Sequence, residues 1–365
     1  MQDILKKYAD LLTHYCVGIK EGDSLYVTST VLAEPLVREL FRSATEAGAN
    51  VEIMLSIREQ EKIFIDHAGE KQLKTVSPFH KLAMETFDTF INIRAPFNLR
   101  EMQNIDPEKS RIRQEANSPV LKTYFERTAN KSMRRSLCQF PTDAAAQEAG
   151  MSLEEYTRFV FSACKLYDED PISSWQEVGR FQQRITDFLN GREQFIYKSD
   201  AFEISFNAAG RTWINSDGKA NMPSGEVYTS PLEDSVNGTI FFSYPAIYMG
   251  KEVEDVRLYV KDGLIEKWEA RRGKDFLDHI FSLSGSRRFG EAAIGLNDHI
   301  QKITKNILFD EKMGGSVHMA IGQSYLQCGG KNESSIHWDM ITDMKESGRI
   351  YADGELIYEC GKFLI

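Results

Sequence analysis

The sequence predicts a mixed α/β and α+β protein with two domains. We expect an N-terminal α/β domain with a parallel sheet, a helical connection, and a β-rich C-terminal domain. Strand-like and helix-like segments alternate at the start of the chain, helical periodicity follows, and alternating strands with tight-turn signals end it. At 365 residues the chain exceeds the length at which one hydrophobic core stops growing, which favours domains at 1–185 and 186–365.

The first elements are a strand at 23–30 (DSLYVTST), a helix at 33–49 and a strand at 50–57 (NVEIMLSI). The helix has apolar residues at helical spacing, and Gly48 suits its C-terminal cap. Such a strand–helix–strand unit favours a parallel pair with a right-handed crossover. A third strand is expected at 88–96, and the absence of a Gly-rich phosphate loop argues against nucleotide binding.

The middle of the chain, 101–189, is predicted to be largely helical, with a capping box at Ser152–Glu155 and a break at 168–174. Strands follow, beginning with the strictly alternating AFEISF. Asp262-Gly263 and Asp353-Gly354 each predict the two-residue turn of a β-hairpin.

Composition excludes several functions. A net charge of −10, with only short basic stretches, argues against nucleic-acid binding. No apolar run approaches the roughly 20 residues that span a bilayer, and the N-terminus lacks a secretory pattern, so no membrane partner and a cytoplasmic location are expected. Five scattered cysteines without C-x-x-C indicate neither a disulfide framework nor a thiolate zinc site.

Two histidines interrupt apolar, strand-like runs. His337 and Asp339 are two residues apart, so in a strand they share a face, opposite Ile336, Trp338 and Met340. His318 follows two glycines in a short apolar strand where small residues leave room for another group. Imidazole and carboxylate are ligands of zinc, manganese and cobalt, although hydrogen-bonded core histidines are the alternative. The remaining histidines, at 14, 67, 80, 279 and 299, are assigned structural or surface roles.

Carboxylates accompany these histidines in the last third of the chain. Glu226, Glu233 and Asp234 lie in a turn-rich segment, 221–238, and Glu291 follows Gly290. Taken singly, they could be solvated loop acids or, for Glu291, a residue at a helix N-terminus. Together with the histidines, they match a two-metal hydrolase whose ions lie about 3.5–4 Å apart.

Four segments, NMPSGEVYTSP…SVNG, FGEAAIG, FDEKMGGSVHMAIGQSY and SSIHWDM, resemble the thermophilic aminopeptidase T and aminopeptidase S family of bacterial metalloaminopeptidases. They occur in the family's order and at similar separations. Further similarity near both ends, as in GDSLYVTS and DGELIYECGKFLI, extends the resemblance over nearly the whole chain.

The resemblance implies a two-domain homodimer that removes N-terminal amino acids from peptides with a free N-terminus. It implies two divalent metal ions, zinc, cobalt or manganese, in the C-terminal domain, with ligands at Glu226, Glu291, His318, His337 and Asp339. Tyr325 falls on a tyrosine that is either a ligand or a polariser of the substrate.

Other features of the site are less defined. An acidic pocket for the substrate's α-amino group is expected at Glu233 or Asp234, and no general base is assigned. The segment 326–336 is shorter than the family's usual connection, which predicts a different access loop. Two alternatives stay open: another metal-dependent amidohydrolase, or a non-catalytic metal- or peptide-binding protein in which these residues form a buried polar network.

Overall fold

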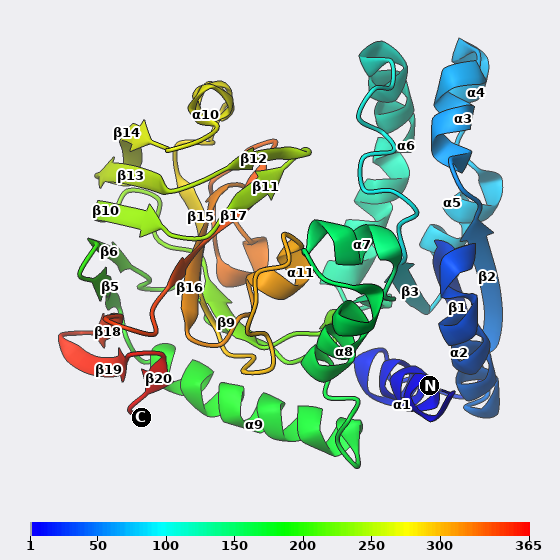
Figure 1. Ribbon diagram of the computed structural model, residues 1–365, viewed down its shortest axis with the longest axis horizontal. Coiled ribbons are helices and arrows are strands. Elements are labelled where there is room, and N and C mark those ends of the chain that lie inside the picture. The colour runs from blue at the N-terminus through cyan, green and yellow to red at the C-terminus, as the bar shows by residue number, and fades with distance from the viewer. Residues whose placement is uncertain (1) are drawn as a thin grey trace. The chain divides into compact units, whose positions relative to one another are not determined.

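The computed structural model describes residues 2–365, which form two compact units. The first unit contains the chain up to Ser174 together with Gly218–Pro223. The second contains Trp175–Asp217 and Ser224–Ile365. Figure 1 shows the elements of both.

The first unit is built on a parallel sheet with the strand order β2-β1-β3-β4-β8. These strands are β1 (Ser24–Thr30), β2 (Asn50–Ser56), β3 (Thr89–Arg94), β4 (Arg134–Gln139) and β8 (Asn221–Met222). The predicted strand–helix–strand unit and its parallel pairing are therefore confirmed.

Helices occupy most of the rest of the first unit. They are α1 (Gln2–Asp10), η1 (Leu11–Cys16), η2 (Val31–Ala33), α2 (Glu34–Glu46), α3 (Gln60–His67), α4 (Glu70–Leu73), α5 (Pro78–Thr86), α6 (Pro107–Ala129), α7 (Asp143–Glu148), α8 (Leu153–Ala163) and the start of α9 (Pro171–Leu189). The capping box of Ser152 and Glu155 begins α8 as predicted. Across residues 2–365, no helix combines the length and the apolar character needed to cross a membrane.

One strand lies where the sequence predicts helix. Within 101–189, residues Arg134–Gln139 form β4 and pair in parallel with β3. The buried face of β4 carries Ser136 and Cys138 rather than large apolar side chains, so the strand has little apolar alternation. Its strand conformation is decided by pairing with β3.

The second unit contains two antiparallel sheets. The larger has the order β14-β13-β10-β6-β5-β18-β19-β20, with bounds Leu264–Glu269, Val256–Lys261, Asn237–Phe242, Phe202–Asn207, Gln194–Ser199, Arg349–Ala352, Glu355–Glu359 and Lys362–Phe363. The smaller has the order β17-β16-β15-β9-β7, with bounds His337–Asp343, Ser316–Gly322, Phe289–Gly295, Glu226–Thr229 and Ile214–Ser216.

Short elements complete the second unit. They are the two-stranded ribbon β11 (Ala246–Tyr248) and β12 (Lys251–Val253), the helices α10 (Lys274–Ile280) and α11 (Ile307–Asp310), and η3 (Leu326–Cys328). The predicted hairpins are confirmed: Asp262-Gly263 joins β13 to β14 and Asp353-Gly354 joins β18 to β19, with positive φ at all four residues.

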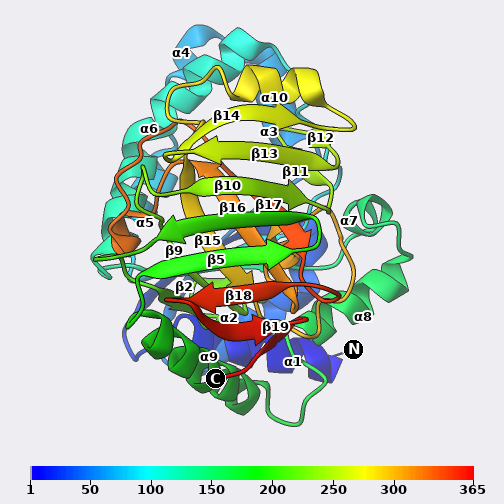
Figure 2. The ribbon, with the colours of Figure 1, turned by 90° about the vertical axis from the view of Figure 1, so that its left-hand side faces the viewer.

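The two sheets of the second unit pack on a shared hydrophobic core. Figure 2 shows the larger sheet in front of β15, β16 and β17. The smaller sheet contributes Val317, Met319 and Ile321 from β16, and Trp338 and Met340 from β17. Because side chains alternate along a strand, the intervening residues of β16 and β17 point away from this core.

Candidate metal centre

The face of the smaller sheet that points away from the core gathers the predicted metal ligands. Pairing places Asp339 of β17 opposite Ala320 of β16, which lies opposite Glu291 of β15. His318 of β16 lies opposite Ala293 of β15. The alanines add little bulk between the polar side chains, so the ligands can converge above them.

A β-bulge turns Glu291 toward this face. Phe289 pairs with Ile321 and Glu291 with Ala320, which leaves Gly290 as the extra residue. In a regular strand without this bulge, residues 289 and 291 would point to the same side, so Glu291 would face the core with Phe289. A Cβ at Gly290 would lie 2.3 Å from the carbonyl oxygen of Gln323, so the position requires glycine.

The nitrogen and oxygen atoms of these side chains lie close together. His337 Nε2 is 3.1 Å from Glu291 Oε2 and 3.6 Å from Asp339 Oδ1. Ligand atoms of these three residues all lie within 4.8 Å of one another. His318 Nε2 is 3.5 Å from Glu226 Oε2 and 3.7 Å from Glu291 Oε1. Glu291 therefore faces both histidines, one with each carboxylate oxygen.

A backbone contact orients His337. Its Nδ1 lies 2.7 Å from the carbonyl oxygen of Gln323, which can only accept a hydrogen bond. Nδ1 is therefore the donor, and in the neutral ring Nε2 carries the lone pair that faces Glu291 and Asp339. This is the arrangement by which proteins prepare a histidine for metal binding.

The electrostatics of the site favour positive charge. Burial disfavours the charged form of His318, but the surrounding carboxylates outweigh it and raise its pKa to about 9. Burial likewise opposes the charge of His337, whose pKa is raised by Asp339 and Glu291. Burial would raise the pKa of Asp339, but His337 above all lowers it to about 2. The buried carboxylates thus attract a cation.

Several polar atoms of the site form no hydrogen bond within the described part of the chain, although two of them lie 3.5–3.6 Å from a histidine nitrogen. Among residues 2–365, Glu226 Oε2, Asp339 Oδ1 and His318 Nδ1 are buried without a hydrogen-bond partner. Leaving such atoms unpaired costs about 1–3 kcal/mol each. Three carboxylates and two imidazoles form the donor set of a borderline divalent ion such as zinc, cobalt or manganese. The residues therefore fit divalent metal ions.

Tyr325 lies at the edge of the same cluster. Its ring centroid is 4.9 Å from that of His337 and 5.2 Å from that of Tyr228, and the residue is 36% exposed. Burial of the hydroxyl, followed by the charges of Glu291 and Asp339, raises its pKa well above the usual value. The structure thus brings all six predicted residues together.

Two local expectations are wrong. Glu226 begins strand β9 rather than lying in a loop, and Glu291 lies in strand β15, so a helix N-terminus is excluded for it.

Glu233 does not offer a free carboxylate for an amino group. Arg211 Nη2 donates a hydrogen bond to Glu233 Oε2 at 2.6 Å, and the backbone N–H of Lys331 donates one to Glu233 Oε1 at 2.7 Å. Asp234, the other acid expected in this role, is exposed.

Two charged residues at the site were not anticipated from the sequence. Lys312 has no exposed side-chain surface, and its Nζ lies 3.5 Å from Glu226 Oε1 and in contact with Glu311 Oε1. The available signal was a run of three charged residues, Asp310 to Lys312, between Phe309 and Met313.

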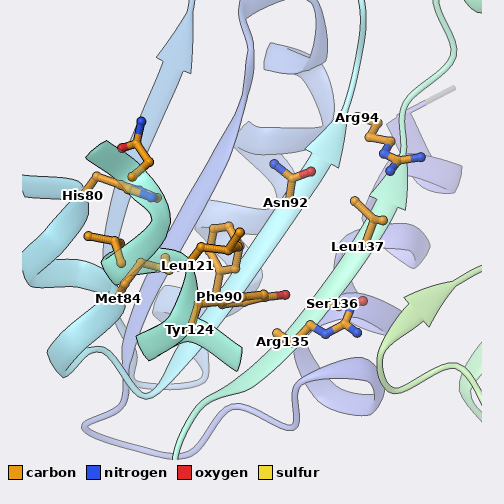
Figure 3. Close-up of a pocket in the computed structure, with 12 residues that line it drawn as sticks. His80, Met84, Phe90, Asn92, Arg94, Leu121, Tyr124, Arg135, Ser136 and Leu137 are labelled. Atoms are coloured by element: carbon orange, nitrogen blue, oxygen red, sulfur yellow. The ribbon is translucent and has the colours of Figure 1, made fainter. Parts of the chain in front are cut away.

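The first unit holds a separate cavity of about 420 Å³ (Figure 3). Strands β3 and β4 and helices α5 and α6 supply its walls, with Phe90, Tyr124 and Leu121 among the lining residues. All its lining residues belong to the first unit, whereas the six candidate ligands belong to the second.

Related proteins are aminopeptidases by name. Aminopeptidase 2 of Geobacillus stearothermophilus is 27% identical over 92% of this chain and 91% of its own length. Aminopeptidase T of Thermus thermophilus is 24% identical over 96% of this chain and 95% of its own length.

Two solved structures share the fold. Wild-type AmpT from Thermus thermophilus superposes with a TM-score of 0.85, at 22% identity, over 99% of each chain. The 2,5-dihydroxypyridine dioxygenase of Pseudomonas putida KT2440 superposes with a TM-score of 0.58, at 14% identity, over 100% of this chain and 96% of its own. These likenesses confirm the predicted fold class.

The family model of the thermophilic metalloproteases (M29) matches residues 1–363. A match over nearly the whole length agrees with the motifs that carry the candidate ligands, and it confirms the resemblance read from them. The chain therefore belongs to the thermophilic metalloprotease (M29) family.

Proposed function

We propose that the protein is a metalloaminopeptidase that uses two divalent metal ions to hydrolyse the first peptide bond of substrates with a free N-terminus. One observation carries the proposal. In a chain of the M29 family, three carboxylates and two imidazoles converge on one sheet face, and buried oxygens of Glu226 and Asp339 accept no hydrogen bond from the described residues.

In this proposal Glu226, Glu291, His318, His337 and Asp339 hold the metals. Glu291 would contribute to holding the metals together with both histidines, because its two oxygens face different imidazoles. Two such ions, when bound, lower the pKa of a water molecule and polarise the scissile carbonyl. Tyr325, beside His337, has a hydroxyl that can donate to the carbonyl oxygen as charge develops there.

The substrate would be a peptide, as the relatives' names indicate, with zinc, cobalt or manganese as the metal. A homodimer in the cytoplasm is part of the proposal and rests on the family resemblance and on the sequence alone. Fold does not decide the chemistry, since a dioxygenase shares this architecture.

Hydrolysis of aminoacyl chromogenic amides tests the function. The protein is stripped with EDTA and assayed after addition of cobalt, manganese or zinc, with an N-acetylated copy of each substrate as control. We expect metal to restore cleavage of the free-amine substrates only, with two metal ions bound per chain by elemental analysis. Equal cleavage of the acetylated substrates would indicate a different amidohydrolase, and no cleavage with any metal would indicate a binding protein.

A further inference from the structure

The cavity of the first unit (Figure 3) combines an apolar wall with a positive charge. Parallel pairing sets Phe90 of β3 beside Arg135 of β4, and Asn92 beside Leu137, so these four side chains share one face of the sheet. Helices α5 and α6 also line the cavity, which has a volume of about 420 Å³. This volume lies within the range of small-molecule sites.

Aromatic and aliphatic side chains form most of the wall. The rings of Phe90 and Tyr124 meet edge to face, with their centroids 5.9 Å apart. Met84 and Val120 are buried, whereas Leu121 of α6 stays 52% exposed. An exposed leucine that lines a cavity can bury its surface against a ligand, which favours an occupant with an apolar group.

Arg135 supplies the positive charge. Its Nη1 donates to two neutral acceptors, the carbonyl oxygen of Ala220 at 3.2 Å and Oδ1 of Asn221 at 3.3 Å, and residues 2–365 place no carboxylate at ion-pair distance from it. Arg94 lines the cavity too, and none of the lining residues, all within the described chain, is an aspartate or glutamate. Burial raises the pKa of Tyr124, and the nearby guanidinium of Arg135 opposes this. The cavity thus offers a guanidinium and a hydroxyl to an anionic group.

Two asparagines supply acceptors to the same space. Nδ2 of Asn92 donates to Thr28 Oγ1 at 2.7 Å, and Nδ2 of Asn117 donates to the carbonyl oxygen of Arg113 at 2.9 Å. Each amide nitrogen is therefore engaged by the fold, and each side-chain oxygen remains to accept from a ligand. Acceptors in the same cavity as a guanidinium suit a ligand whose N–H group is close to its carboxylate.

We propose that this cavity binds an apolar amino acid with a free carboxylate, either as the free amino acid or as the C-terminal residue of a peptide. The carboxylate binds Arg135 and the hydroxyl of Tyr124, the apolar side chain packs on Phe90 and Leu121, and the nitrogen donates to Asn92. No candidate metal ligand lines the cavity, so the inference is independent of the proposed function.

Isothermal titration calorimetry of the full chain with metal bound tests the proposal. The probes are N-acetyl-L-phenylalanine, which has the amide and carboxylate of a peptide C-terminus, and L-phenylalanine, the free amino acid. N-acetyl-L-phenylalaninamide, which lacks the carboxylate, is the control. We expect at least one acid to bind, and the amide to bind at least about tenfold more weakly because charge-assisted hydrogen bonds are lost. The acid that binds more tightly identifies the source of the ligand.

Variants locate the binding. Arg135→Gln should weaken binding of the acid at least about tenfold. Arg111→Gln is the matched control, because Arg111 also lies on the first unit's surface, pairs with acids of its own helix and does not line the cavity. It should leave the affinity within about twofold, since salt screens distant charges. Leu121→Glu, at a half-exposed position that tolerates a polar side chain, should also weaken binding because it adds a negative charge to the wall. His337→Ala should bind the acid as the wild type does.

Hydrogen exchange shows which unit holds the ligand. Bound acid should slow exchange in β3, β4 and α6 and leave β15, β16 and β17 unchanged. Equal affinities for acid and amide, or no binding of either acid, would overturn the proposal. So would binding that is lost in His337→Ala and kept in Arg135→Gln, because the ligand would then occupy the metal centre.

Discussion

At the scale of single residues, His337 joins the sheet to the candidate metal site. Its Nδ1 donates to the carbonyl of Gln323 at 2.7 Å, and its Nε2 faces Glu291 at 3.1 Å. One ring nitrogen is thus committed to the fold and the other to the site. The role of this side chain can be tested without disturbing the core, because Trp338 and Met340 carry the apolar packing of the strand.

His337→Ala should lose metal binding and activity together. We expect metal affinity to fall more than about 100-fold, because a ligand and its fixed orientation are both removed. Equilibrium dialysis with elemental analysis measures this. His279→Ala, at an exposed histidine of α10, is the control and should bind metal normally. Full metal content in His337→Ala would exclude this ligand.

Asp310 makes stability depend on pH. Burial raises its pKa to about 7, above its ordinary value of 3.8. Between these values the folded protein holds a proton that the unfolded chain has released, so stability is full below pH 4 and falls as pH rises to 7. The loss amounts to about 4 kcal/mol. The Tm of Asp310→Asn relative to the wild type should therefore rise from pH 4 to 7 and then level off. A difference that is constant with pH would contradict this.

At the scale of elements, the bulge in β15 decides whether the site exists. It places Phe289 in the core and Glu291 on the opposite face, and only a residue without a Cβ fits beside the Gln323 carbonyl. The same carbonyl accepts the hydrogen bond from His337 Nδ1. One backbone segment therefore positions ligands on two strands.

Gly290→Ala should destabilise the protein by about 3 kcal/mol, because its Cβ would meet backbone that cannot rotate away. Relaxation of the bulge should also weaken metal binding. Denaturant unfolding and metal titration measure the two effects. Gly191→Ala, whose Cβ would meet its nearest neighbour at 3.4 Å, should change stability by less than about 0.5 kcal/mol. Equal effects of the two substitutions would refute this role for the bulge.

At the scale of the whole molecule, the candidate ligands all belong to the second unit. A ligand that binds only the folded state stabilises the region that must be folded to hold it. At a free ligand concentration of 100 times Kd, this stabilisation is about 2.7 kcal/mol. The first unit has its own sheet and contributes no candidate ligand. Metal should therefore stabilise the two units unequally.

Hydrogen exchange measures this difference. Removing metal with EDTA should speed exchange in β15, β16 and β17 and leave β1, β2 and β3 nearly unchanged, because local opening free energies differ across a structure. Restoring zinc or cobalt should reverse the change. Equal loss of protection in both sheets would show that the units open together.

Local patterns in the sequence were sufficient for several features. Asp-Gly pairs predicted both hairpins because few residues accept positive φ at two successive positions. The two-residue spacing of His337 and Asp339 placed them on one face because a strand alternates with period two. The family motifs indicated which acids accompany them.

The sequence by itself determined the order of most elements, the hairpins and the candidate ligands, since each depends on residues close together in the chain. Only the tertiary structure decided that 134–139 is a strand, that Gly290 turns Glu291 outward, that Arg211 engages Glu233, and that Lys312 links Glu311 to Glu226. These features depend on strand pairing, or on side chains brought together from distant or buried positions. Local periodicity in the sequence does not indicate such contacts, so it could not predict them.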